Sequence, residues 1–450
     1  MSVTRFTDLR HAKRLHQIVE TLSHAPNASV PEATKSASAA QSIYRFWSNS
    51  KVTLDAILNS HIDGTTERSR SCETVLAIQD TTDLNFTSHR ATAGLGYLNH
   101  TQQQGIKVHS TFGVSGAGEP LGLLGQASWV REQPPQPKKG RKASEQPGHK
   151  PIEEKESFRW LEGLRGAESK VAAGTQLVHM GDREADIFEL FAQPRVANSE
   201  LLIRVKTNRK VKHELGKLFP ALAQSPVLGE LTVTVKRTPQ RPARVARVAI
   251  RAIAVTIEVP DYLAKQKPTL VPVELNALLV EEVTPPADGG KPICWKLLTS
   301  LPLDSFEAAC QAVRWYSYRW LIERYHFTLK SGCKIEDLQL QHRHRLLKAL
   351  ATYSIVAWRL MAMTYQARLT PGVSCEVIFT PTEWKLLRRR FVPKSRSKKP
   401  PTLHQATRWL ARLGGFQGRK GDGEPGIKTL WRGYTKLQYL LEGAQLAKKT

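Results

Sequence analysis

Two apolar runs constrain the fold of this chain more than any other feature. Residues 75–79 and 176–180 are mainly apolar, and an acid follows each run, Asp80 after the first and Asp182 after the second. Strands that are apolar at successive positions are buried on both faces, as in sheets covered by helices. The carboxyl ends of such strands meet at one edge of the sheet. The two runs therefore predict an α/β fold in which Asp80 and Asp182 lie side by side.

The predicted elements divide the chain into three parts. Residues 1–65 carry helical patterns only, and residues 346–450 are again helical. The part between them, residues 70–345, contains the two apolar runs and further strand candidates at 108–114, 121–130 and 201–205. Within it, residues 207–302 alternate with a period of two, which predicts a large antiparallel β insertion. We therefore expect helical domains on both sides of an α/β core.

A polar stripe follows the β insertion. If residues 316–330 form one helix, Tyr316, Arg319, Glu323 and Lys330 project within a stripe about 60° wide. A phenol, a guanidinium, a carboxylate and an ammonium would then share one face. An ordinary salt-bridged amphipathic helix has the same i,i+3 and i,i+4 pairs, so the stripe alone assigns no function.

The three acids Asp80, Asp182 and Glu323 are candidate metal ligands. Asp80 is also compatible with a turn and Asp182 with a helix cap, so each has a purely structural explanation. Three carboxylates about 5 Å apart repel one another by roughly 3 kcal/mol per pair at an effective dielectric constant of 20, and cations relieve that repulsion. Mg²⁺ or Mn²⁺ binds oxygen ligands without Cys or His, and two such ions about 4 Å apart support phosphodiester chemistry.

The charge balance predicts a polyanionic partner. The 450 residues include 66 Lys and Arg against 40 Asp and Glu, a formal net charge of +26. DNA or RNA is the usual partner of such a protein. An anionic membrane surface is the alternative, but proteins that bind one usually do so through a basic amphipathic helix. Two basic segments stand out, a loop at 133–150 and a tract at 385–399 that has eight Lys or Arg and no acid.

Several features indicate a cytoplasmic protein. Residues 346–363 form the most apolar helical candidate, but Lys348 and Arg359 within it favour a core helix over a membrane span. The first residues lack the apolar run of a secretory signal. The five cysteines are scattered without a C-x-x-C pair, which favours reduced thiols and argues against a zinc module.

Three motifs in this order resemble those of a known family. They are Ile78-Gln79-Asp80-Thr81-Thr82, the stretch at 181–187 that reads Gly-Asp-Arg-Glu-Ala-Asp-Ile, and the Tyr316 to Lys330 spacing. The chain resembles bacterial insertion-sequence cut-and-paste transposases of the hairpin-forming type. These have a DDE acid triad on a ribonuclease-H-like fold and a Y-x2-R-x3-E-x6-K signature. Further similarity at 40–49, 295–300 and 410–416 extends the resemblance over nearly the whole length.

The resemblance implies roles for individual residues. The metal-binding acids would be Asp80, Asp182 and Glu323, holding two Mg²⁺ or Mn²⁺ ions. The side chains that hold phosphates and the displaced strand would be Tyr316, Arg319 and Lys330. Trp295 aligns with a residue that stacks on a flipped base, although a single Trp in a strand is equally compatible with the core. Arg204, at a strand end, matches a phosphate-contacting position.

The resemblance also implies an activity. The protein would bind the terminal inverted repeats of its element through residues 1–65 and pair the two ends as a homodimer through its C-terminal helices. It would then cut double-stranded DNA and join the freed 3′ hydroxyls to target DNA. Two other functions stay open from the residues alone: a ribonuclease-H-like nuclease without strand transfer, and a DNA-binding protein without catalytic activity. We expect a bacterial protein associated with the nucleoid when it is bound to DNA, and not with membrane.

Overall fold

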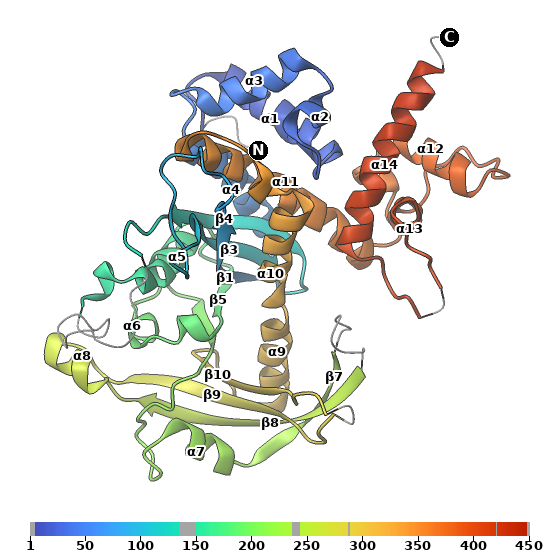
Figure 1. Cartoon of the computed structure of the whole chain (residues 1–450). Helices are drawn as coiled ribbons and strands as arrows, with labels where there is room; N and C mark the ends of the chain where they lie inside the picture. The colour runs from blue at the N-terminus through green and yellow to red at the C-terminus, as the bar shows by residue number, and fades with distance from the viewer. Residues whose placement is uncertain (1–4, 135–149, 236–243, 287–288, 420, 448–450) are drawn as a thin grey trace.

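The computed structural model of the chain describes residues 5–134, 150–235, 244–286, 289–419 and 421–447. Over these residues the protein is a mixed α/β structure, with one ten-stranded mixed sheet and helices packed around it (Figure 1). Most of the predicted basic loop, including Lys138, Lys139, Arg141 and Lys142, lies outside the described residues.

Five strands of the sheet have the order β4-β3-β1-β5-β6. Their bounds are Thr74–Asn85 for β1, Gln104–Ser115 for β3, Pro120–Trp129 for β4, Gln176–Gly181 for β5 and Ser199–Arg204 for β6. Strand β3 pairs antiparallel with β1 and β4, whereas β5 pairs parallel with β1 and β6. The apolar residues of β1 and β5 are buried, which confirms the prediction of strands covered on both faces. Strand β2, Gly96–Tyr97, pairs with one end of β3.

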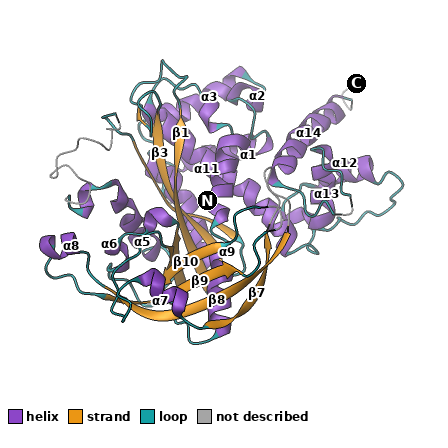
Figure 2. Ribbon diagram, turned by 60° about the horizontal axis from the view of Figure 1, so that its bottom comes forward, coloured by secondary structure: helices purple, strands orange, loops and turns teal. Residues whose placement is uncertain are grey.

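The predicted β insertion is confirmed. Its strands are β7 Val227–Val235, β8 Arg244–Ile257, β9 Val273–Glu282 and β10 Cys294–Thr299, all paired antiparallel. Because β10 also pairs with β6, the insertion extends the central sheet instead of forming a separate one (Figure 2). Two short helices, α7 Leu218–Gln224 and α8 Asp261–Gln266, lie within this region.

The N-terminal part is helical, as predicted. It contains α1 Leu9–His24, α2 Val30–Thr34, α3 Ala37–Ser48 and α4 Leu54–Ser69. Asp8 caps α1 by accepting a hydrogen bond from the Arg10 N–H, at 2.8 Å. Helix α4 packs on β4, where Arg68 Nε donates to the Leu121 carbonyl oxygen at 2.7 Å. This last helix is therefore attached to the sheet.

Helix α11, Arg343–Leu369, connects the parts of the molecule. It contacts the N-terminal helices α1, α3 and α4, strand β4, and the C-terminal helices α13 and α14 (Figure 1). By length and composition it is the one helix among the described residues that is long and apolar enough to cross a membrane, but 72% of its apolar window is buried within the protein. The prediction of a core helix at residues 346–363 is confirmed.

Three helices complete the C-terminal part: α12 Pro381–Phe391, α13 Leu403–Leu413 and α14 Ile427–Leu446. Helices α13 and α14 approach so closely that glycine is required at the crossing. A Cβ atom on Gly433 would lie 1.9 Å from the Leu410 carbonyl oxygen, and one on Gly414 would lie 1.8 Å from that of Thr429. The close crossing holds the two helices in one fixed arrangement.

The prediction of a single helix over residues 316–330 is wrong. The chain forms α9 Phe306–Ser317, α10 Trp320–Phe327 and a π-helical turn at Thr328–Gly332. Between α9 and α10 the hydrogen bonds tighten to three-residue spacing, from Tyr318 N–H to the Trp315 carbonyl and from Arg319 N–H to that of Tyr316. No glycine or proline marks this break, so the sequence pattern carries no signal for it.

The segment after β5 is only partly helical. It has a 3₁₀ turn at Arg183–Ala185 and a short helix, α6, at Phe188–Phe191. Asp186 lies between them, and its carboxylate accepts hydrogen bonds from the backbone N–H groups of Lys206 and Thr207. Before β5 the chain forms helix α5, Arg159–Glu168.

Candidate active site

Asp80 lies within β1, and Asp182 lies directly after the end of β5. In the parallel pairing of β1 with β5, Ile78 lies opposite Met180, and each acid follows two residues later. Because neighbouring strands are about 5 Å apart, we expect the two acids to lie near one another. The prediction that Asp80 ends its strand is wrong, since β1 continues to Asn85 through its pairing with β3.

Glu323 lies on α10 and is connected to Asp80 by Arg319, which interacts with both acids. The Arg319 guanidinium donates a hydrogen bond to Glu323 Oε1, and the same guanidinium interacts electrostatically with Asp80. The Glu323 side chain is 56% exposed, whereas that of Arg319 is 17% exposed. A half-buried arginine therefore lies between two of the predicted metal-binding acids and offsets their repulsion.

Tyr316 lies on the other side of Arg319. Its side chain is buried, and burial raises the pKa of Tyr316 to about 12, so the phenol is neutral at physiological pH. It interacts electrostatically with Arg319, Arg204 and Asp182. The Trp295 ring on β10 packs edge-on against it, with 5.5 Å between ring centroids. Trp295 is half-buried, so it is both a packing partner and accessible beside the site.

Arg204, at the end of β6, completes this group of cations. Its guanidinium donates to the Cys294 carbonyl oxygen at 3.2 Å, and burial lowers its pKa from the usual value of an arginine. Arg183 and Arg319 are among its electrostatic neighbours. Three arginines therefore stand close to the acids, where an anionic substrate would be attracted.

Lys330 has a different position from the one that a single helix would give it. It lies in the π-helical turn, and its ammonium donates to the Asp83 carbonyl oxygen at 2.6 Å and to Thr82 Oγ1 at 3.4 Å. It also lies 3.7 Å from Glu336. In this structure Lys330 therefore holds the part of β1 that directly follows Asp80.

Two further residues at the site were missed by the sequence analysis. His326 lies one turn after Glu323 on α10, and its Nδ1 is 3.5 Å from Asp80 Oδ2. The i,i+3 spacing from Glu323 is the signal that would have found it. The second is Arg159 at the start of α5, for which the sequence contains no comparable spacing signal.

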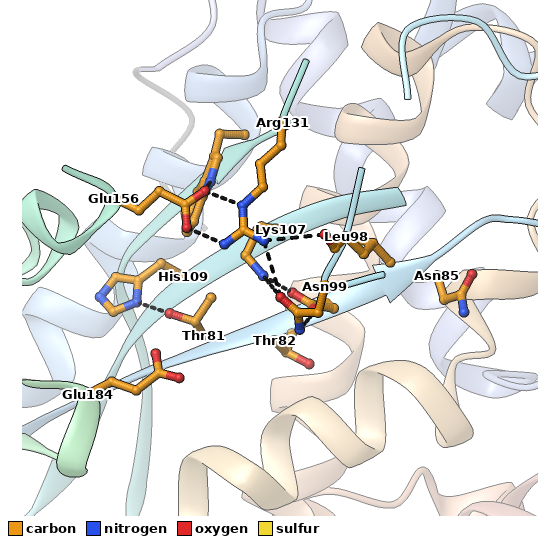
Figure 3. A network of polar contacts seen from close by, with 12 residues as sticks. Thr81, Thr82, Asn85, Leu98, Asn99, Lys107, His109, Arg131, Glu156 and Glu184 are labelled. Carbon is orange, nitrogen blue, oxygen red and sulfur yellow. Dashed lines mark hydrogen bonds and ion pairs between the residues drawn. The ribbon is translucent and has the colours of Figure 1, made fainter. Parts of the chain in front are cut away.

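Arg159 links the segments that carry the two aspartates. Its Nε donates to Thr81 Oγ1 at 2.9 Å, next to Asp80, and its Nη2 donates to Glu184 Oε2 at 2.8 Å, two residues after Asp182. Its remaining nitrogen, Nη1, donates to the Glu156 carbonyl oxygen at 2.7 Å. Thr81, Glu184 and the neighbouring His109 lie together in Figure 3. The planar guanidinium thus joins β1, α5 and the segment after β5.

A polar network around the buried Lys107 supports the second half of β1. The Lys107 ammonium on β3 donates to Asp83 at 2.5 Å and to Asn99 at 3.4 Å, although the Lys107 side chain is only 7% exposed. Arg131 donates to Asn99 at 3.2 Å and also to the carboxylate of Glu156 (Figure 3). Hydrogen-bonded charges of this kind hold the backbone after Asp80 in one position.

Asp186, in the segment after β5, stabilises the fold. Its side chain is fully buried and is paired with Arg209, and it accepts hydrogen bonds from the N–H groups of Lys206 and Thr207 at 2.9 and 2.8 Å. These contacts join the segment after β5 to the chain that leaves β6. The sequence motif does not distinguish this acid from Asp182, which accepts a hydrogen bond from the Glu184 N–H at 2.8 Å.

The oxygen donors at this edge suit a hard divalent cation. Asp80 and Asp182 each follow the end of the β1–β5 pairing by two residues, whereas Glu323 is held by Arg319 in this conformation. Among the described residues, no three His, Cys, Asp or Glu side chains form a metal-binding group. All five cysteines are free thiols, as expected. The metal-binding role of the three acids stays a prediction.

Family models match both ends of the chain. Residues 1–52, which include α1 to α3, match the model described as transposase DNA-binding. Residues 355–450, from within α11 to the C-terminus, match the model described as Transposase Tn5 dimerisation domain. The segment between them, which carries Asp80, Asp182 and Glu323, lies outside both matches. The two matches make this chain similar, at both of its ends, to the DNA-binding and Tn5-type dimerisation domains of transposases.

Proposed function

We propose that this protein catalyses cut-and-paste DNA transposition by metal-dependent phosphodiester hydrolysis followed by strand transfer. The observation that carries the proposal is the parallel pairing of β1 with β5, which ends two residues before Asp80 on one strand and two residues before Asp182 on the other. Arg319 interacts with both Asp80 and Glu323 beside this point. This acidic edge lies in a chain whose ends match a DNA-binding and a dimerisation domain of transposases.

The topology supports a ribonuclease-H-like catalytic core. Three antiparallel strands, β4, β3 and β1, continue into the parallel strands β5 and β6. Asp80 lies within β1, just beyond the point where its parallel pairing with β5 ends, and Asp182 directly follows β5. The insertion β7 to β10 enters after β6 and brings Trp295 to Tyr316.

The acids are proposed to hold the catalytic cations. Asp80, Asp182 and Glu323 supply oxygen ligands, and Glu323 joins the other two when Arg319 moves to a DNA phosphate. When bound, two Mg²⁺ or Mn²⁺ ions supply an activated water or hydroxyl for attack at phosphorus and stabilise the leaving oxygen. Arg159 and Lys330 keep the segments around Asp80 and Asp182 in position from the protein side.

The cations and aromatic rings around the acids are proposed to position DNA. Arg319 and Arg204 offer planar guanidinium groups that match phosphate oxygens. The neutral phenol of Tyr316 is buried beside them, and its hydroxyl is proposed to contact a phosphate once DNA displaces its neighbours. Trp295 is proposed to stack on a flipped base during hairpin formation, where stacking contributes roughly 1–3 kcal/mol. Lys330 is expected to reach a phosphate only after leaving the Asp83 carbonyl oxygen.

The proposed function is tested by incubating the full-length protein with Mg²⁺, DNA that carries the element's terminal inverted repeats, and a target plasmid. We expect cleavage at the element boundary, hairpin ends, and products in which the freed 3′ hydroxyls are joined to the target. Cut ends without joined products would instead identify a nuclease, and DNA binding without cleavage would identify a non-catalytic relative. Omitting Mg²⁺ should stop cleavage and leave DNA binding unchanged.

Replacing Arg159 with methionine should slow cleavage about 10- to 100-fold, the usual cost of removing a group that orients metal ligands. The change breaks the link between Thr81 and Glu184 but removes no metal ligand. The readout is the Mg²⁺ concentration needed for half-maximal cleavage, which should rise while DNA affinity stays constant. Arg165 on the same helix donates to Gln193 at 2.7 Å and serves as the control. Equal effects of Arg159→Met and Arg165→Met would contradict a positioning role.

A further inference from the structure

The C-terminal part carries a strongly basic surface away from the acids. Residues 384–421 contain twelve Lys or Arg and no Asp or Glu. We define the C-terminal basic surface as the exposed cations of α12 and the segment that follows it, namely Lys385, Arg389, Arg390, Lys394, Arg396, Lys398 and Lys399. Helix α12 lies at the outer end of the molecule, apart from β1, in both views (Figures 1 and 2).

These charges have no acidic partner in the described part of the chain. None of the seven side chains takes part in an ion pair there, whereas Arg408 on the adjacent helix α13 lies 3.7 Å from Glu424. Uncompensated like charges repel one another and destabilise a compact arrangement. A fixed cluster of cations without internal partners is therefore suited to an external polyanion.

Contacts made by Arg388 and Arg412, which are not among the seven cations, hold the C-terminal basic surface in one conformation. The Arg388 guanidinium donates to the carbonyl oxygens of Ser397 and Lys399, which folds the segment after α12 back along the helix. The same guanidinium lies 4.6 Å from the Trp384 ring centroid. Arg412 of α13 lies 4.6 Å over Phe391, which connects the two helices. The cations of the helix and of the segment are thus presented together.

A groove on α13 continues this region. It has a volume of about 390 Å³ and is lined by basic, polar and aromatic side chains, among them Arg408, Arg412, Trp409 and Phe416. Arg412 belongs both to the groove and to the contact with Phe391. Guanidinium groups interleaved with aromatic rings are typical of surfaces that follow a nucleic-acid backbone.

We propose that the C-terminal basic surface binds the phosphate backbone of double-stranded DNA without reading its sequence. It would be a DNA contact separate from the N-terminal match at residues 1–52, and independent of metal and catalysis. Charge complementarity favours DNA over a second copy of this chain, because two copies of the surface would repel. A membrane surface is disfavoured, since large exposed apolar side chains of α12 and the segment after it are limited to Val392 among the residues described.

The test removes four charges of the surface at once. The variant carries Arg389→Gln, Arg390→Gln, Lys394→Gln and Lys398→Gln in the full-length protein. Its matched control removes four exposed lysines that are spread over the β insertion, through Lys212→Gln, Lys217→Gln, Lys265→Gln and Lys291→Gln. Both variants lose the same net charge, so a difference in their DNA affinity must come from where the removed charges lie on the protein. Thermal unfolding of each variant establishes that it is folded.

Binding is measured with a duplex of unrelated sequence, in EDTA, over a range of salt concentrations. The surface variant should bind at least about 10-fold more weakly at low salt, and the slope of log affinity against log salt should become shallower by about 2–4. The control should change the slope by less than about 1. Equal slopes for the two variants would overturn the proposal, as would loss of dimerisation with DNA affinity unchanged. Because the duplex carries no element ends, the result is independent of cleavage.

Discussion

Replacing Asp182 with asparagine should abolish DNA cleavage and leave DNA binding unchanged. Asparagine keeps the size of the side chain and an oxygen that accepts the Glu184 N–H, but it removes the negative charge. We expect the cleavage rate to fall by more than about 10³-fold, which corresponds to about 4 kcal/mol of transition-state stabilisation. The same result is expected for Asp80→Asn and Glu323→Gln. Single-turnover cleavage with Mg²⁺ and a gel shift without it measure the two quantities.

Asp261→Asn provides the control for the loss of one negative charge. Asp261 lies on α8 with a side chain that is 79% exposed, paired with Lys210 at 3.1 Å. Its replacement should leave cleavage at the parental rate. If a variant of Asp80, Asp182 or Glu323 also cleaves at that rate, the acid concerned has been assigned wrongly. Retained cleavage in all three would exclude the proposed metal site.

Replacing Asp186 with alanine should have the largest effect on stability. The Asp186 side chain is 0% exposed and Arg209 is 8% exposed, so the change leaves a buried guanidinium and two backbone N–H groups without their acceptor. Breaking a buried ion pair of this kind costs about 3–5 kcal/mol. The free energy of unfolding from denaturant titration should fall by that amount. Asp261→Ala, which breaks the exposed pair, should cost less than about 1 kcal/mol.

A double variant keeps this prediction testable if Asp186→Ala does not fold. Asp186→Leu combined with Arg209→Met replaces the pair by apolar side chains, and it should recover part of the lost stability because no buried charge is left alone. A double variant that is no more stable than Asp186→Ala would show that the backbone contacts of Asp186 matter more than its pairing with Arg209.

Asp182 and Asp186 show what a sequence motif can and cannot predict. Both acids belong to the stretch at 181–187, but Asp182 directly follows β5, whereas Asp186 is buried against Arg209. The position of Asp182 was predictable, because it follows an apolar run of the sequence. The pairing of Asp186 was not, because its partner lies 23 residues away and no local pattern connects them.

The segment that carries the polar stripe shows the opposite case. The spacing of Tyr316, Arg319 and Glu323 correctly indicated that these side chains lie together, since Arg319 interacts with both of the others. The chain nevertheless breaks into α9, α10 and a π-helical turn, with no glycine or proline where α9 ends and α10 begins. Lys330 consequently reaches β1, through a contact between residues that are 247 positions apart.

The sequence by itself determined the elements whose burial follows a period: the strands of the core, the β insertion, and the helices at both ends. It also determined which acids follow the buried apolar runs, because hydrophobic burial is repeated along the chain and leaves a local pattern. It did not determine that β1 continues beyond Asp80 to Asn85. Only the tertiary structure decided which charges meet, including Arg159 between Thr81 and Glu184, Lys330 on β1, and Asp186 with Arg209. Each of these contacts occurs once, between residues that are far apart in the sequence. No repeating sequence pattern therefore exists from which they could be inferred.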